Sequence, residues 1–153
     1  MTPLCILMRT GLASTPPSQF FWGWIALCTA LAVHIFDEAC TGFLSVYNPT
    51  VMALRQRRPW LPLPVYTFGA WLAGLVAGNA MLFGLSYFAL RGFVWMRPLG
   101  FIFAAILLIN GLVHIGATVR GRTVESVHFR RPISGTYSSP LMLLASIYML
   151  YVL

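Results

Sequence analysis

The chain has 153 residues, of which 59% are hydrophobic and only 8% are charged. Soluble domains carry about a quarter charged residues, so a water-soluble protein of this size could not bury so much apolar surface. The net charge of +7 comes from ten basic and three acidic residues, but the arginines lie between apolar segments and form no patch with exposed aromatic residues, which argues against nucleic-acid binding.

The N-terminal part predicts a tail followed by a first membrane span. Residues 1-19 are interpreted as a short tail, because the apolar stretch before Arg9 is too short to cross a bilayer. The first span is expected over residues 20-40, with Trp22 and Trp24 near its start, where an aromatic belt would lie.

A more polar connection leads to the second span. Asn48-Pro49 is a turn or helix-start signal. The stretch that follows, which ends in Arg55, Arg57 and Arg58, predicts a short helix in the membrane interface. The second span is expected over residues 65-90.

Two further spans are expected over residues 99-119 and 137-153. The last apolar stretch, Pro140 to Leu153, is shorter than the roughly 20 residues that a full span needs. The predicted fold is therefore all-α: one membrane domain over residues 1-153, with a four-transmembrane-helix bundle and an interfacial helix after the first span.

Arginine counting predicts the orientation of this bundle, because cytoplasmic loops carry an excess of basic residues. With four spans, the termini and the middle turn share one side, which holds Arg9, Arg91 and Arg97. The other side holds Arg55, Arg57, Arg58, Arg120, Arg122, Arg130 and Arg131. We therefore expect loops 1 and 3 in the cytoplasm and both termini outside.

The end of the first span carries ionisable groups that are costly inside a membrane unless they are paired or hydrated. His34 is followed three and four residues later by Asp37 and Glu38, so all three project towards one side of a helix. One imidazole and one or two carboxylates are suitable ligands for a divalent metal such as zinc, iron or manganese. They are equally suitable for acid–base catalysis.

The third span carries a second polar pair, Asn110 and His114, four residues apart on one helical face. At about 1.5 Å per residue, His34 and His114 lie at similar depths in spans that run in the same direction. We therefore expect His34, Asp37, Glu38 and His114 to form one catalytic or metal-binding site, with Asn110 in support.

Weaker signals lie elsewhere. Gly74 and Gly78 have GxxxG spacing, which favours close helix packing and a possible homo-oligomer. Asn79 is expected to form an interhelical hydrogen bond. Glu125 and His128 are three residues apart in an arginine-rich loop. We expect this loop to be a solvated surface and not a part of the site.

The three cysteines have no metal-site or disulfide spacing. They are expected to pack as small apolar residues: Cys5, Cys28 and Cys40.

The His34-x-x-Asp37-Glu38 sequence resembles the first motif of the HXXEE domain family, with aspartate in place of the first glutamate. His114 is similar to the second histidine of that family, and Tyr137-Ser138-Ser139-Pro140-Leu141 to its Tyr-x-Pro-Gly motif, with one extra residue and no glycine. The family comprises small, mostly bacterial integral membrane proteins of undetermined function that are suspected of catalysis. The resemblance implies a membrane enzyme, in a bacterial inner membrane.

Three functions remain open from the sequence. The first is a membrane-embedded hydrolase or isomerase that acts on a lipid or another apolar substrate. The second is a haem or electron-transfer protein with the two histidines as axial ligands. The third is a non-catalytic transporter or a subunit of a membrane complex, in which an intramembrane carboxylate relays protons.

Overall fold

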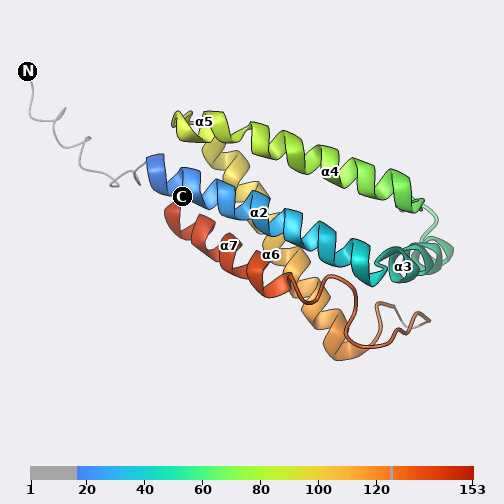
Figure 1. Cartoon of the computed structure of the whole chain (residues 1–153). Coiled ribbons are helices and arrows are strands. Elements are labelled where there is room, and N and C mark those ends of the chain that lie inside the picture. The colour runs from blue at the N-terminus through green and yellow to red at the C-terminus, as the bar shows by residue number, and fades with distance from the viewer. Residues whose placement is uncertain (1–16, 125) are drawn as a thin grey trace, which may run out of the picture.

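The computed structural model describes residues 17–124 and 126–153, and within these ranges the chain is all-helical, with no strand (Figure 1). The predicted all-α class is confirmed. The helices are α2 (Pro17–Thr41), α3 (Leu44–Arg57), α4 (Phe68–Gly84), α5 (Ser86–Leu90), α6 (Met96–Arg120) and α7 (Ser139–Val152).

Three helical segments are long and apolar enough to cross a membrane: Ser18–Thr41, Phe68–Leu90 and Met96–Arg120. They correspond to the first three predicted spans and are consistent with an integral membrane protein. Helix α7 has 14 residues, which at about 1.5 Å per residue give about 21 Å, less than the roughly 30 Å of a hydrocarbon core. The fourth span therefore stays a prediction.

The centre of the bundle is formed by α2, α6 and α7. Helix α7 packs against both α2 and α6, and it runs in the opposite direction to them (Figure 1). Buried apolar residues from all three helices make up the core, among them Trp24, Leu107 and Met149. Cys28 is fully buried in this core, as its expected packing role requires. The same expectation is wrong for Cys40, which is exposed at the end of α2, and Cys5 lies outside the described residues.

Gly100 lies where α6 approaches α2 and α7 closely. A Cβ atom there would overlap Cε of Met149, the flexible end of that side chain, and would lie 3.1 Å from Cε2 of Phe20. Small residues at such positions let membrane helices pack closely. This packing stabilises helix association in lipid, where the hydrophobic effect does not drive helices together.

Helix α4 packs on the outside of this core, against α2 (Figure 1). The indole nitrogen of Trp24 donates a hydrogen bond to the backbone carbonyl of Leu82, 3.0 Å away. Most of the remaining α4 surface faces outwards, and a Cβ atom at Gly74 or Gly78 would meet nothing within 4 Å. Asn79 is buried, but its side-chain oxygen has no hydrogen-bond partner among the described residues, so the expected interhelical bond is not made by that atom.

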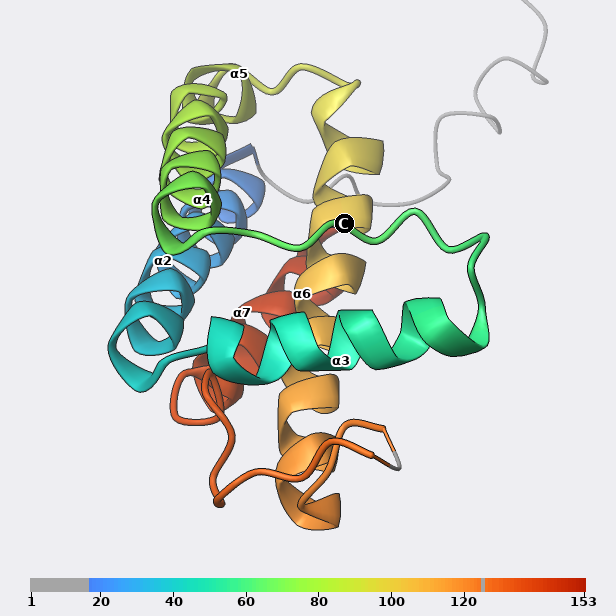
Figure 2. The same cartoon turned by 90° about the vertical axis from the view of Figure 1, so that its right-hand side faces the viewer.

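Helix α3 lies across one end of the bundle (Figure 2). The prediction that Asn48-Pro49 starts a helix or a turn is wrong, because α3 begins at Leu44 and Pro49 lies inside it. Proline so close to a helix start removes only one internal hydrogen bond. The Asn48 side chain instead fastens the following linker, since it donates to the carbonyl of Tyr66 at 2.9 Å and accepts from its N–H at 3.2 Å.

The return loop, described over residues 121-124 and 126-138, connects α6 to α7 and folds back into the bundle. It begins at Gly121, which has a φ of +73°, the left-handed conformation that commonly ends helices. Thr118 holds the loop against α6 through its hydroxyl, 2.7 Å from that of Thr136. Its last part is buried, including Ser134, Gly135 and Ser138.

Candidate metal centre

His34 and Glu38 extend from the same face of α2 into the bundle. Their side chains are buried, with relative exposures of 1% and 5%. Nε2 of His34 lies 3.4 Å from Oε1 of Glu38. The spacing of four residues places the two side chains one above the other on the helix, which makes this contact possible without any distortion.

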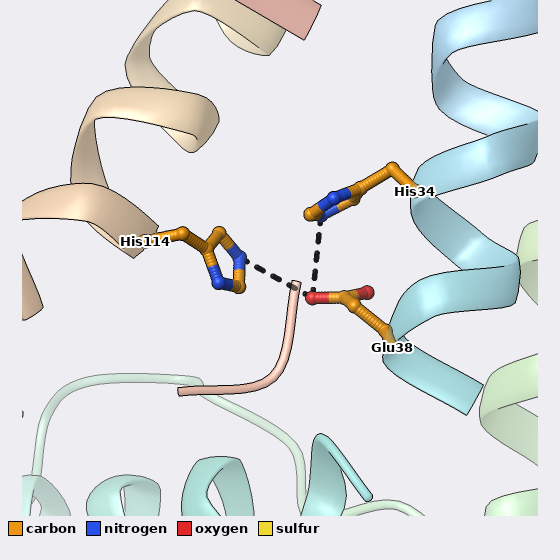
Figure 3. A group of neighbouring side chains, drawn as sticks. All are labelled: His34, Glu38 and His114. Carbon is orange, nitrogen blue, oxygen red and sulfur yellow. Dashed lines mark ion pairs between the residues drawn. The ribbon is translucent and has the colours of Figure 1, made fainter. Parts of the chain in front are cut away.

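His114 reaches the same carboxylate oxygen from α6. Its Nε2 lies 3.3 Å from Oε1 of Glu38, and the two imidazole rings meet edge to face with centroids 4.9 Å apart. Figure 3 shows both histidines converging on Glu38 from different helices. The residues His34, Glu38 and His114 form a buried group whose ligand atoms lie within 4.8 Å of one another and could hold a metal ion, and we call this candidate site the metal centre.

The hydrogen bond at the second ring nitrogen of His114 shows which nitrogen carries a hydrogen. Nδ1 lies 2.6 Å from the backbone carbonyl oxygen of Ser134. A carbonyl only accepts hydrogen bonds, so Nδ1 carries the hydrogen and donates it. In the neutral ring, Nε2 then presents a lone pair to Glu38.

A serine and a carboxylate orient His34 in the same way. Oγ of Ser138 lies 2.8 Å from Oδ2 of Asp37 and 2.8 Å from Nδ1 of His34. An ionised Asp37 has no hydrogen to donate, so the Ser138 hydroxyl donates to Asp37 and accepts from Nδ1 of His34. In the neutral ring, Nε2 of His34 then also presents a lone pair to Glu38.

Three electron-rich atoms thus face one another in a buried space. Such an arrangement is repulsive unless a cation or a proton lies between them. Two ligands that are each about 2.0–2.1 Å from a tetrahedral zinc ion are about 3.3 Å apart. The two observed contacts to Glu38, 3.3 and 3.4 Å, agree with that spacing.

Gly135 closes the metal centre on the side of the return loop. Its φ is +82°, and a Cβ atom there would lie 2.7 Å from Cε1 of both His34 and His114. Only glycine tolerates this conformation at so close an approach. The backbone of the loop therefore contacts both imidazole rings directly.

Asn110 lies beside the metal centre, with Nδ2 3.2 Å from Nε2 of His34. Since that nitrogen carries a lone pair, the amide donates to it. Asn110 and His114 also line a cavity of about 720 Å³ between α3 and α6, so a molecule in this cavity reaches the edge of the metal centre.

The structure brings together three of the four predicted site residues and places the fourth next to them. Asp37 does not face the metal centre; its carboxylate accepts from the backbone N–H of Ser138 at 2.9 Å and from its hydroxyl. Hydrogen bonds from metal-ligating histidines to such partners orient the ligands. His128 is exposed on the return loop, and Glu125 lies outside the described residues.

Three residues of this site were not predicted individually: Ser134, Gly135 and Ser138. The resemblance of residues 137-141 to the third HXXEE motif is a signal for Ser138 alone, and Ser134 and Gly135 precede that motif. Tyr137, the tyrosine of that motif, is exposed on the surface of the loop.

No protein-family model, curated protein or solved structure matches this chain. Membership of the HXXEE domain family accordingly stays a prediction.

Proposed function

We propose that the protein is a membrane-embedded, metal-dependent hydrolase that acts on a lipid or another apolar substrate. The observation that supports this proposal is the convergence of two imidazole lone pairs and a carboxylate, with both imidazoles held by hydrogen bonds at Nδ1. Two histidines and one glutamate are a donor set of catalytic zinc sites, which leave a fourth position open.

The residues of the chain have separate tasks in this proposal. His34, Glu38 and His114 hold the ion, while Ser138, Asp37 and the Ser134 carbonyl fix the two rings. A divalent ion bound there would polarise an ester or phosphoryl oxygen and lower the pKa of water. Asn110, at the border of the cavity, is placed to orient a substrate carbonyl.

Proton transfer for an isomerisation is the second candidate, and the same lone pairs support it. A proton shared among Glu38, His34 and His114 would relieve their repulsion as a cation would. A haem protein is a poorer match, because the two rings are in edge-to-face contact and Gly135 lies against both, which leaves no room for a macrocycle between them.

The proposal includes the way in which the chain crosses the membrane. The return loop and α7 together would form a fourth, partly irregular span, and α3 would lie in the interface with loops 1 and 3 in the cytoplasm. The protein would reside in a bacterial inner membrane, as the HXXEE resemblance implies. Self-association through Gly74 and Gly78 would use a face of α4 that the described residues leave open.

Hydrolysis of long-chain esters by the purified protein in nanodiscs tests the function. We expect activity that a chelator abolishes and that zinc, iron or manganese restores. His34→Ala, Glu38→Gln and His114→Ala should lose it, whereas His128→Ala, which removes an exposed histidine, should keep it. Activity that survives both the chelator and His114→Ala would contradict a metal-dependent mechanism.

A further inference from the structure

The cavity beside the metal centre has an apolar wall on each side. Phe43, just before α3, and Val46 and Leu54 of α3 form one wall, and Ile109 and Val113 of α6 form the other. Its volume of about 720 Å³ is in the range of pockets that hold small organic ligands. An apolar chain would fit between the two helices.

The charged residues of this cavity are all at one end. Arg120 and Arg122 line it, and the lining residues include neither aspartate nor glutamate. Within residues 17–124 and 126–153, no carboxylate forms an ion pair with either arginine. Tyr47 also lines the cavity; its hydroxyl, whose pKa is raised by burial and then by the neighbouring Tyr66, donates to the backbone carbonyl of Pro64 at 3.3 Å.

The distance between the arginines and the metal centre follows from the helix. His114 and Arg120 are six residues apart on α6, which corresponds to about 9 Å along its axis. This separation is about the length of a glycerol phosphate unit, with the arginine side chains free to bend towards the ligand. Guanidinium groups bind phosphate through paired, charge-assisted hydrogen bonds.

We propose that this cavity binds a single-chain anionic glycerolipid, with its phosphate on Arg120 and Arg122, its acyl ester beside His114 and Asn110, and its chain between α3 and α6. The proposal deepens the proposed function, because it names the substrate class of the same site. Binding itself requires the arginines and the cavity and does not require the metal.

Photo-cross-linking tests this assignment in phosphatidylcholine nanodiscs. The probes are lysophosphatidate and lysophosphatidylcholine with the same diazirine-bearing chain, and the labelled peptides are identified by mass spectrometry. We expect the anionic probe to label α3 and α6 several-fold more strongly than the zwitterionic probe, with glycerol phosphate competing poorly because it lacks the chain.

Variants separate the two parts of the cavity. Arg120→Gln with Arg122→Gln should reduce labelling by the anionic probe several-fold, whereas Arg55→Gln with Arg58→Gln, outside the cavity, should not. Gly116→Leu should reduce labelling by both probes, because it fills the cavity from a position where a Cβ atom meets nothing within 4 Å. Gly69→Leu in α4 is equally free of contacts and is the matched control.

A chelator distinguishes failure of this inference from failure of the proposed function. Preferential labelling that persists with the chelator, together with metal-dependent release of the acyl chain, supports both. Preferential labelling without any hydrolysis supports the lipid site and contradicts the hydrolase. Equal labelling by the two probes, or labelling spread over all the lipid-facing helices, would overturn the lipid site.

Discussion

At the residue scale, the metal centre depends on hydrogen bonds at the far side of each imidazole. The Ser134 carbonyl fixes His114, and the pair of Ser138 and Asp37 fixes His34. These contacts decide which ring nitrogen carries a hydrogen, and they turn both Nε2 atoms towards Glu38. A cation at His34 would take the lone pair that otherwise accepts from Asn110.

Removal of one such contact gives the first prediction. Ser138→Ala should weaken zinc binding about 10-fold or more, since partners of metal-ligating histidines contribute about 10–100-fold to affinity. Zinc titration with a competing chelator measures this effect. Tyr137→Phe, next to it but exposed, is the control; an equal loss in that variant would show that the hydrogen bond to His34 is not the cause.

The second prediction concerns the contact between Gly135 and the two rings. Gly135→Ala should displace both imidazoles and destabilise the fold by about 1–3 kcal/mol, because it combines a strained backbone conformation with overlapping atoms. Zinc affinity and thermal unfolding should therefore decrease together. Gly116→Ala, in open space, should change neither, and an unaffected Gly135→Ala protein would mean that the loop lies further from the histidines.

The meeting of three residues of this site could be predicted from their spacing in the sequence. The spacing of four between His34 and Glu38 and the matched depth of His114 depend on helix geometry alone, and these three residues do meet. Asp37 was grouped with them because it also lies near the face of His34. At about 100° per residue, however, Asp37 lies on one side of His34 and Glu38 on the other, so that Asp37 faces Ser138 of the loop instead.

At the scale of the elements, the long apolar helices were predictable and the return loop was not. The spans α2 and α6 begin and end within a few residues of their predicted positions, because the length of each apolar stretch defines them and arginines mark both ends of α6. The path of residues 133-138 depends on tertiary contacts such as that between Thr118 and Thr136, which leave no periodic pattern in the sequence. The early start of α3 was missed for a similar reason, since Asn48 is bound to the distant Tyr66.

The third prediction concerns helix packing. Gly100→Leu should destabilise the bundle by about 1–3 kcal/mol, because its side chain would overlap Met149 and Phe20. Thermal unfolding in detergent measures the change. Gly74→Leu, where no atom lies near, should leave the stability of the monomer unchanged, and a lower oligomeric mass in that variant would support self-association through α4. Equal stability of the two variants would contradict the close packing of α6.

At the scale of the whole molecule, a fourth prediction concerns orientation. Cys40 is exposed at the end of α2 on the arginine-rich side, so it reports on that side once Cys5 and Cys28 are replaced by serine and alanine. In intact cells a membrane-impermeant thiol reagent should not label Cys40, whereas a tag after Leu153 should be accessible. Accessibility of both sites, or of neither, would put them on one side of the membrane and show that α7 and the loop do not reach across the bilayer. The reverse pattern would invert the orientation.

The buried His–Glu–His group lies beside the return loop, which takes the place of the first part of a regular helical span. Helix α7 starts only at Ser139, and the loop before it provides the backbone carbonyl and the hydroxyl that the two histidines need. A regular helix would have used its carbonyls internally. The short last helix and the metal centre are therefore two consequences of the same irregular loop.

The metal content of the purified protein tests the central claim most directly. We predict about one zinc, iron or manganese ion per chain in the wild type and in His128→Ala, and its loss in His34→Ala, Glu38→Gln and His114→Ala with the helical content retained. Well-folded wild-type protein that takes up none of these ions when they are supplied, or an equal metal content in all the variants, would contradict the metal centre.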